Sequence, residues 1–204
     1  MIKVFHSPRS RSNRVVWLCE EMGVPYDIVA LKLGEKPPEL LKHNPGATVP
    51  LMTDGELVLF ESITMLEYIA DRYGPTDLVL PPHHPNYWDY RQMLLFGEAT
   101  LAAPINAMIG TLFRGPDDQK SNYTMDVIRD SFRKRLGVVS NRLAERPYVA
   151  GDSFTLADIS VVYGLSIVKM VPPLGLSDLM AGLMIDYFQR CTEREAYQRM
   201  TKVK

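Results

Sequence analysis

The residues best suited to chemistry lie between Asn44 and Tyr73. A residue that precedes proline favours extended backbone, so the N–H and C=O of Val49 could pair with a bound peptide if Val49 lies on an exposed strand edge. Ser62 stands at the start of a helical pattern, where a hydroxyl and free N–H groups receive a carboxylate, and Glu61 beside it could hold an ammonium group. This pair fits the amino-acid end of a ligand, which carries both charges on one carbon.

The elements around this stretch have clear sequence signals. Asp54-Gly55 between two apolar runs is a strong hairpin signal, so Leu51-Met52 and residues 57–59 should be neighbouring antiparallel strands. After Ser62, apolar residues recur at helical spacing until Gly74-Pro75 ends the helix. Taken piece by piece, the stretch would be an ordinary hairpin and a capped helix, but the combination in this order favours a binding site.

The rest of the first half alternates strand and helix signals. Strands are expected over residues 2–6 and 26–31, a helix from about Asn13 to Gly23, and a short helix over 37–42. With the hairpin and the following helix, the order is β-α-β-α-β-β-α. This order predicts a layered helix–strand sandwich.

A proline-rich segment, residues 74–85, separates this half from a helical second half. Pro104 should kink or interrupt the first helix of the second half. Thr155 and Asp158 form a Thr-x-x-Asp capping box, which opens a later helix and is structural. The longer helices are expected over 87–113, over 122–144 and from Thr155 to Pro172-Pro173, with two shorter helices after that.

The composition is that of an ordinary soluble globular protein, with 46% hydrophobic and 23% charged residues among 204. A formal net charge of -1 implies no attraction to nucleic acid or to a membrane. No apolar run reaches the roughly 18–20 residues that span a bilayer. Cys19 and Cys191 lie far apart, which indicates a reducing compartment and buried thiols. The adjacent His83 and His84 point apart, so no metal site is expected.

Two motifs carry a resemblance to a known family. The first is Val49-Pro50, the hairpin, Glu61-Ser62 and a helix that ends Tyr-Ile-Ala-Asp-Arg-Tyr. The second is the segment 149–158, which reads Val-Ala-Gly-Asp-Ser-Phe-Thr-Leu-Ala-Asp. With an all-helical second half, these motifs resemble the cytosolic glutathione S-transferases, bacterial-like members of the serine type in particular. The resemblance covers nearly the whole chain.

The resemblance implies an α/β thioredoxin-like N-terminal domain over residues 1–75 and a linker over 76–86. An all-α C-terminal helical domain over 87–204 would then contribute a hydrophobic substrate site. The family is typically a homodimer, and its members are cytoplasmic detoxification enzymes. The implied partners are glutathione and a small apolar electrophile, with no metal, nucleic acid or membrane.

The same resemblance assigns the glutathione contacts. In the family, the proline of the Val-Pro pair is cis, and the residue before it pairs with the cysteinyl backbone of glutathione. The Glu-Ser pair holds the γ-glutamyl end. On this chain the implied glutathione-binding residues are Thr48, Val49, Pro50, Glu61 and Ser62.

Conjugation by such an enzyme needs a thiolate, whereas a free thiol with a pKa near 8.5 is only about 3% ionised at pH 7. A hydroxyl that donates to the sulfur, aided by a helix N-terminus, stabilises the anion. Serine-type members carry a serine, three residues and an arginine before the first apolar helix, which matches Ser10 and Arg14. Ser12 is the alternative, because it lies one position past Arg11, where some bacterial members carry a catalytic cysteine. Both serines could instead merely cap the helix.

The remaining contacts are less well marked. Relatives often hold the glycine end of glutathione with His, Lys or Gln shortly before the Val-Pro pair, where this chain has Ala47 and Thr48. Thr48, Lys36 or His43 could substitute, and affinity for glutathione could be lower than is typical. Arg9, Arg11 and Arg14 make the mouth of the serine loop basic, which favours an anionic ligand or an acidic co-substrate. The apolar substrate would lie against helix 87–113. Its candidate contacts are Arg11, Met93, Phe96, Gly97, Leu101, Phe113 and Tyr163.

The function predicted is a glutathione transferase that conjugates apolar electrophiles, with Ser10 stabilising the thiolate. One alternative is a related glutathione-dependent isomerase or reductive dehalogenase, which measured product chemistry would distinguish. The other is a non-catalytic binding or interaction module that kept the fold. Ala47 and Thr48 mildly favour that second alternative, whereas the intact Glu61-Ser62 pair opposes it.

Overall fold

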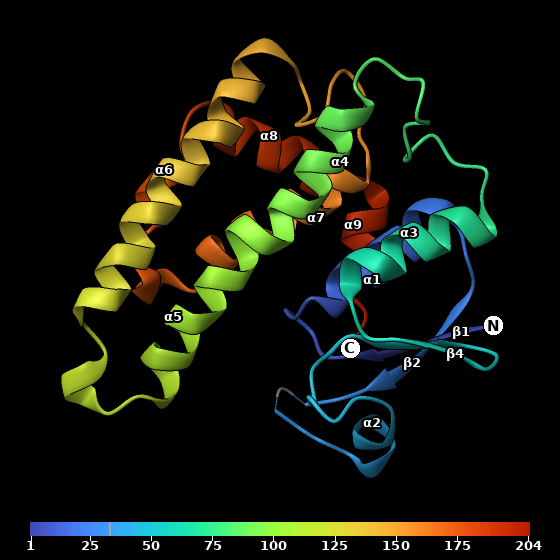
Figure 1. Cartoon of the computed structure of the whole chain (residues 1–204), viewed down its shortest axis with the longest axis horizontal. Coiled ribbons are helices and arrows are strands. Elements are labelled where there is room, and N and C mark those ends of the chain that lie inside the picture. The colour runs from blue at the N-terminus through green and yellow to red at the C-terminus, as the bar shows by residue number, and fades with distance from the viewer. Residues whose placement is uncertain (33) are drawn as a thin grey trace. The chain divides into compact units, whose positions relative to one another are not determined.

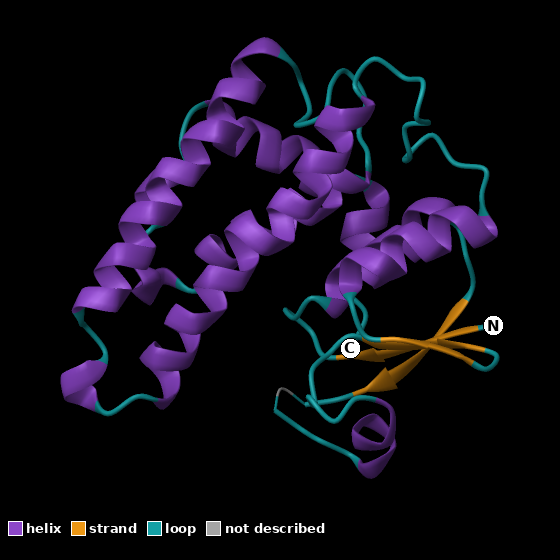
Figure 2. Cartoon of the chain, in the orientation of Figure 1, coloured by secondary structure: helices purple, strands orange, loops and turns teal. Residues whose placement is uncertain are grey.

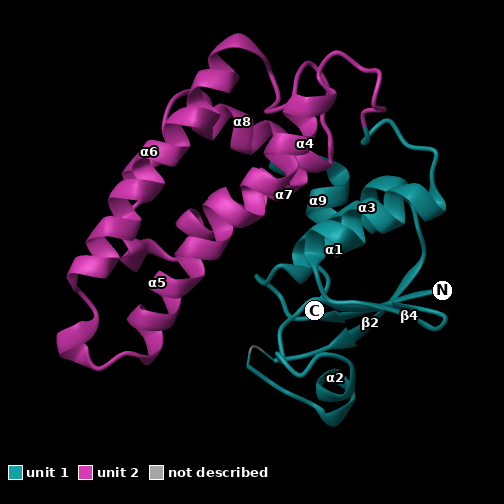
Figure 3. Cartoon of the chain, in the orientation of Figure 1, with its two compact units in different colours: residues 1–79, 192–204 teal, residues 80–191 magenta. Residues whose placement is uncertain are grey.

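The computed structural model describes residues 1–32 and 34–204, and the chain divides into two compact units. Unit 1 comprises Met1–Val79 and Thr192–Lys204, and unit 2 comprises Leu80–Cys191 (Figure 3). Unit 1 combines a sheet with helices, whereas unit 2 is helical (Figure 2). The predicted fold class, a thioredoxin-like domain and a helical domain, is confirmed.

Unit 1 contains one four-stranded sheet with the strand order β2-β1-β3-β4 (Figure 1). β1 pairs in parallel with β2, whereas the β1–β3 and β3–β4 pairs are antiparallel. Gly55, with a φ of 61°, opens the two-residue loop of the β3–β4 hairpin, as the Asp-Gly signal predicted. The strands are β1 (Ile2–His6), β2 (Tyr26–Ala30), β3 (Leu51–Asp54) and β4 (Leu57–Leu59).

Three helices complete the first part of unit 1, each within one or two residues of its predicted limits. α1 and α3 pack against each other, and they lie on one side of the sheet, with α2 on the other (Figure 2). Gly23, with a φ of 64°, ends α1 in a left-handed turn whose N–H donates to the carbonyl of Cys19. The helices are α1 (Ser12–Met22), α2 (Pro38–His43) and α3 (Ser62–Tyr73).

A small apolar core on the α2 side of the sheet determines where the Val49 segment lies. Phe5, Leu40 and Leu51 are completely buried members of this core, and the side chain of Val49 packs against it. Full burial of a Val or Leu side chain contributes about 1.5–3 kcal/mol. The apolar side chain of Val49 therefore anchors the backbone that the sequence singled out for binding.

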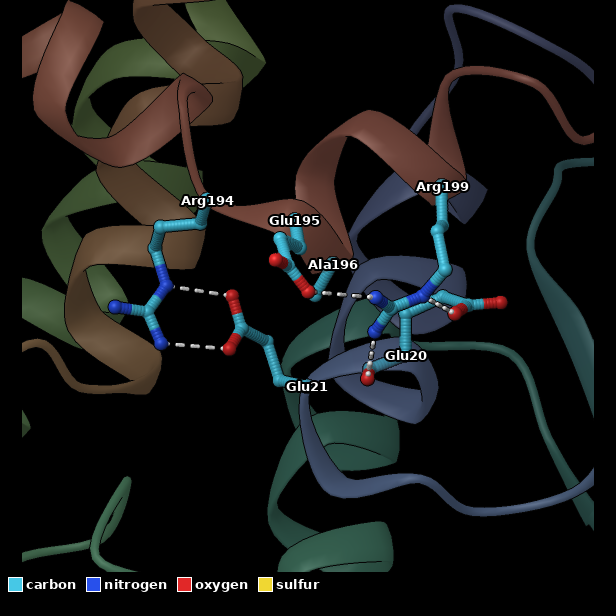
Figure 4. Close-up of a pocket in the computed structure, with 6 residues that line it drawn as sticks. All are labelled: Glu20, Glu21, Arg194, Glu195, Ala196 and Arg199. Carbon is cyan, nitrogen blue, oxygen red and sulfur yellow. Dashed lines mark hydrogen bonds and ion pairs between the residues drawn. The ribbon is translucent and has the colours of Figure 1, made fainter.

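The last helix of the chain, α9 (Glu195–Met200), packs on α1 within unit 1. Arg194 donates two hydrogen bonds to Glu21, of 2.7 and 2.6 Å, and Arg199 donates to the Glu20 carboxylate at 2.6 Å (Figure 4). A pocket of about 290 Å³ lies among these residues, but its acidic and basic groups pair with one another. The pocket is thus a seam of ion pairs that ties α9 to α1.

This packing differs from the domain limits expected from sequence. The boundary between the units falls at Val79, inside the predicted linker 76–86, but Thr192–Lys204 belongs with unit 1. Helical periodicity carries no information about which domain a terminal helix joins. The packing of the Trp17 and Tyr197 rings, whose centroids are 4.9 Å apart, is a contact across 180 positions that sequence patterning does not reveal.

Unit 2 is organised around α7, a helix in which every residue from Leu156 to Val168 is buried. A helix that is apolar on all sides belongs in the centre of a bundle. α4 and the segment after it form the largest contacts with α7. The longer helices are α4 (Tyr87–Leu95), α5 (Ala103–Arg114), α6 (Tyr123–Glu145), α7 (Leu156–Met170) and α8 (Leu183–Thr192). Short 3₁₀ turns span Asp117–Gln119, Pro172–Leu174 and Ser177–Leu179.

α4 and α5 are joined by a π-helical segment, η1 (Phe96–Ala102), so that one helix runs through Tyr87–Arg114. Pro104 was expected to kink or interrupt this helix. The α-helical pattern does change to π turns just before it, and Pro104 lies in the first turn of α5, from which the helix continues to Arg114. By length and mean hydropathy this helix could cross a membrane. Its packing against α7 instead identifies it as a core helix of unit 2.

The buried carboxylate of Asp158 holds the start of α7. It accepts hydrogen bonds from the N–H groups of Val149 (3.0 Å) and Thr155 (2.8 Å), and from the hydroxyl of Tyr187 (2.9 Å). The Thr155 hydroxyl in turn accepts from the N–H of Ala157. Burial raises the pKa of Asp158 to about 6, and these hydrogen bonds act in the opposite direction. The predicted capping box is confirmed.

We expect Asp158→Ala to lower the free energy of unfolding by about 3 kcal/mol or more, because several buried donors lose their acceptor. Asp152→Ala is the matched control, since Asp152 is exposed in the preceding turn and should change stability by less than about 0.5 kcal/mol. Urea denaturation of both variants, followed by circular dichroism, measures the difference. Equal losses in the two variants would contradict the role given to Asp158.

Candidate active site

The loop between β1 and α1 is built around the hydroxyl of Ser12. The Ser12 Oγ lies 2.7 Å from the Ser10 Oγ, 2.8 Å from the His6 Nδ1 and 3.1 Å from the Ser7 carbonyl oxygen. The Ser7 N–H donates to the same Ser12 oxygen at 3.2 Å, and the Ser12 N–H donates to the Ser10 Oγ at 3.2 Å. This network fixes the serine loop at the first turn of α1.

The two candidate serines differ in exposure. Ser12 is completely buried, whereas Ser10 is partly exposed. Arg11, not a serine, occupies the N-cap position of α1 and makes no side-chain capping bond. The positive end of a helix dipole stabilises an anion that lies near the helix N-terminus. Of the two serines, only Ser10 has exposed surface that such an anion could contact.

His6 is a member of this network that the sequence did not single out. Its ring is almost completely buried, and burial lowers its pKa, with the Val203 backbone acting in the opposite direction. The imidazole is therefore neutral at physiological pH. The only sequence signal was a polar residue at the end of an apolar strand.

The segment before β3 leaves the backbone of Val49 available. Val49-Pro50 is a cis peptide bond, as the resemblance implied. Val49 lies in the loop before β3 rather than on a strand edge, because β3 begins at Leu51 between β1 and β4. Among the described residues, no hydrogen bond engages the Val49 N–H or C=O. These two groups are thus placed to pair with a ligand backbone.

Asn44, which sequence reasoning did not treat as a site residue, shapes this loop. Its side-chain amide donates to the Thr48 carbonyl oxygen at 3.1 Å and to the Thr48 hydroxyl at 2.9 Å. Its side-chain oxygen accepts from the Gly46 N–H at 3.1 Å. The Asn-Pro-Gly sequence was the available signal, since Asn side chains bond to the backbone two residues on. Ala47, with a φ of 52°, completes the bend.

At the start of α3, Glu61 is the N-cap residue and Ser62 the first helical residue, so the helix begins one residue earlier than the N-cap position predicted for Ser62. Ser62 is buried, and its hydroxyl accepts a hydrogen bond of 3.2 Å from the Arg14 guanidinium. Glu61 is exposed at the helix mouth. Arg14, which was expected at a basic mouth, is instead completely buried and connects α1 with Ser62 at the start of α3.

The other predicted contacts are less closely organised. Thr48 is exposed at the mouth of the Val49 loop, and Arg11 is partly exposed at the start of α1. In unit 2, Met93 and Leu101 are completely buried, whereas Phe113 is 64% exposed. Of the remaining unit 2 candidates, Phe96 is partly exposed and Gly97 and Tyr163 are buried. The role of these residues toward a second substrate stays a prediction.

Close helix packing explains why residue 97 is a glycine. A Cβ at this position would lie 2.4 Å from the Ser160 Oγ and 2.5 Å from the Ser160 carbonyl carbon. Such distances require the neighbouring atoms to move, so glycine permits η1 and α7 to pack closely. This packing accounts for the glycine without a ligand.

The cysteines offer no alternative nucleophile. Cys19 and Cys191 are both buried, and neither forms a disulfide. Burial, chiefly, raises the pKa of Cys19 to about 12, so its thiol stays protonated. In the part of the chain that the structure describes, no cluster of His, Cys, Asp and Glu could hold a metal ion.

The fold and the site together define a class. A thioredoxin-like unit with a cis-proline loop before β3, a polar loop after β1 and an acidic residue at the start of α3 precedes a helical unit. Residues 1–71 match the family model for the glutathione S-transferase N-terminal domain, and residues 102–195 match that for the C-terminal domain. The chain belongs to the glutathione S-transferase family.

Individual relatives agree with this assignment. Glutathione S-transferase 3 of Schizosaccharomyces pombe is 32% identical over 174 residues, which cover 78% of this chain and 70% of the relative. A probable glutathione S-transferase of Oryza sativa, GSTF1, is 30% identical over 78% of this chain and 77% of its own length. The fold is also similar to that of glutathione transferase URE2P6 from Phanerochaete chrysosporium in complex with oxidized glutathione, with a TM-score of 0.85 and 21% identity. That alignment covers 98% of this chain and 94% of the other.

The network predicts that Ser12 contributes more than Ser10 to the stability of the ligand-free protein. We expect Ser12→Ala to lower the free energy of unfolding by about 2 kcal/mol, because the buried Ser7 N–H loses its acceptor. Ser10→Ala should cost less than about 1 kcal/mol, since water can replace its partly exposed hydroxyl. Chemical denaturation of the two variants compares them, and a larger loss for Ser10→Ala would contradict the arrangement.

Proposed function

We propose that this protein is a glutathione transferase of the serine type, in which Ser10 stabilises the glutathione thiolate for attack on an apolar electrophile. The observation that carries the proposal is the partly exposed Ser10 hydroxyl beside the N-terminus of α1, bonded to the buried hydroxyl of Ser12. Family membership and the names of the relatives support the activity.

The glutathione contacts follow from the chemistry of each segment. Val49, with its free backbone groups, pairs with the cysteinyl backbone, and Pro50 holds that segment in place. The N–H groups of the first turn of α3, with the Ser62 hydroxyl, receive the γ-glutamyl carboxylate, and Glu61 receives its ammonium group. The exposed Thr48 is the candidate for the glycine end.

Activation of the thiol requires a moderate stabilisation. Lowering the thiol pKa by two units corresponds to about 2.7 kcal/mol of differential interaction with the anion. A hydroxyl donating to the sulfur and the positive end of α1 act in the same direction. Ser12, completely buried, acts on the sulfur through Ser10 in this proposal.

The helical unit supplies the contacts of the electrophile in this proposal. Phe96 and Phe113 are the candidates with exposed surface. The protein is a cytoplasmic homodimer, as is typical of the family, and its two cysteines, neither of which forms a disulfide, agree with a reducing compartment. Light scattering coupled to gel filtration tests the oligomeric state.

The primary test is a glutathione titration at pH 6.5 that follows the ultraviolet absorbance of the thiolate. A saturable thiolate signal supports binding with activation. Binding detected by calorimetry without a thiolate signal would instead indicate a non-catalytic module. Activity with a panel of electrophiles, with products identified, then separates conjugation from isomerisation and dehalogenation.

Glu61→Ala should weaken glutathione binding by about 1.5–3 kcal/mol, because a charge-assisted contact with the γ-glutamyl ammonium group is lost. Glu56→Ala is the matched control, since Glu56 is an exposed carboxylate on the hairpin loop of the same unit. Calorimetry measures both affinities. Equal affinity of Glu61→Ala and the parent protein would refute the role of Glu61.

Ser10→Ala should raise the pKa of the bound thiol by about one unit or more and leave affinity largely intact, because the hydroxyl interacts best with the anion. The pH dependence of thiolate absorbance in the saturated complex measures this pKa. An unchanged value would transfer the role to Ser12 or to backbone amides.

A further inference from the structure

The hydrogen-bond network around Ser12 can be counted completely, because a hydroxyl has one proton to donate and accepts at two lone pairs. Ser12 Oγ has four close partners: the Ser7 N–H, the Ser7 carbonyl oxygen, the His6 Nδ1 and the Ser10 Oγ. The Ser7 N–H can only donate, so it occupies one acceptor site of Ser12. Which group donates to the other acceptor site of Ser12 depends on which nitrogen of His6 carries the proton.

If the Nδ1 of His6 carries the proton, it donates to Ser12 and fills the second acceptor site. The single Ser12 proton then goes to the Ser10 oxygen at 2.7 Å rather than to the Ser7 carbonyl oxygen, which is farther away at 3.1 Å. Ser10 Oγ already accepts from the Ser12 N–H, so both of its acceptor sites are then filled as well. The Ser10 proton has no acceptor within the network and points away from it, toward a bound ligand.

If the Nδ1 is unprotonated, it accepts the Ser12 proton instead. Ser12 then has an acceptor site left for the Ser10 hydroxyl, and Ser10 donates inward. In that arrangement the Ser10 oxygen presents a lone pair outward, which repels a thiolate. The tautomer of His6 therefore decides whether Ser10 is a donor or an acceptor at the ligand.

The environment of the second ring nitrogen favours the outward arrangement. His6 Nε2 is buried and makes no hydrogen bond of acceptable geometry within the described residues. The Val203 backbone acts on the His6 ring, but no well-aligned acceptor among the described residues faces Nε2, whereas a proton on Nδ1 has the Ser12 oxygen 2.8 Å away. The Nδ1–H tautomer satisfies every donor of the network, with only the partly exposed Ser10 proton directed to solvent or ligand.

We infer that His6 is a positioning residue for thiolate stabilisation: by donating from Nδ1 to Ser12, it fixes Ser10 as an outward hydrogen-bond donor. The inference rests on the proposed function of Ser10. Donors aligned in one direction also polarise one another, so the Ser10 hydroxyl is a stronger donor than an isolated serine. A filled Ser10 oxygen cannot accept the thiol proton, which leaves to solvent.

Ring nitrogen NMR of the ligand-free protein tests the tautomer. The chain has four histidines, and the His6→Asn variant identifies the His6 signals by their absence. We expect Nδ1 to be protonated and Nε2 unprotonated at neutral pH. A proton on Nε2 would overturn the inference whether or not the protein binds glutathione.

Two substitutions test the consequence for the sulfur. The amide nitrogen of Asn occupies a place similar to Nδ1 on the ring, so His6→Asn keeps a donor to Ser12, whereas His6→Leu fills the space without one. We expect His6→Leu to raise the pKa of the bound thiol by about half a unit or more, which is about threefold less thiolate below the pKa. His6→Asn should stay within about 0.2 units of the parent protein. Equal shifts in the two variants would indicate a packing effect only and overturn the inference.

A double-mutant cycle determines whether His6 acts through Ser12. In a Ser12→Ala background, His6→Leu should cause no further change in the thiol pKa. Additive shifts of the thiol pKa would contradict an effect of His6 that is transmitted through Ser12 to Ser10. If the parent protein gives no thiolate signal, the proposed function fails, while the NMR result still decides the arrangement of His6 and Ser12.

Discussion

The buried hydroxyl of Ser12 is the contact on which the candidate site depends. It joins the end of β1, through His6 and Ser7, to the first turn of α1. A buried oxygen with this many partners tolerates little movement, because each displaced donor would lose a hydrogen bond that water cannot replace. The exposed neighbour, Ser10, therefore occupies a defined position although it lies in a loop.

The second half of the site is held by different means. Val49 is anchored by its apolar side chain, and its loop is shaped by the Asn44 side chain. The start of α3 is connected to α1 by the hydrogen bond from Arg14 to Ser62. Buried side chains thus support each segment, while the groups proposed to contact glutathione are backbone atoms, hydroxyls and one carboxylate. Such support from buried neighbours is what positions a site accurately.

Much of unit 1 and the outline of the site could be predicted from sequence, because their signals are local. The Asp54-Gly55 hairpin, the apolar face of α3 and the Thr155 capping box each depend on a few adjacent residues, and all three are confirmed. The roles of His6 and Asn44 could not be predicted. A histidine in a strand or an asparagine in a loop is common, and its role depends on which groups the folded chain places beside it. The π turns before Pro104 and the contact of α9 with α1 likewise depend on packing between distant elements.

Unit 1 is assembled from two pieces of chain that are far apart in the sequence. Its sheet and first three helices are complete by Tyr73, but the ion pairs and the aromatic contact on α1 come from residues beyond Thr192. During synthesis, at about 5–20 residues per second, α1 therefore waits several seconds or more while unit 2 is being made. Throughout this interval the side chains of Trp17 and Glu21 lack their partners from α9, so the nascent thioredoxin-like unit exposes a surface that the finished protein covers.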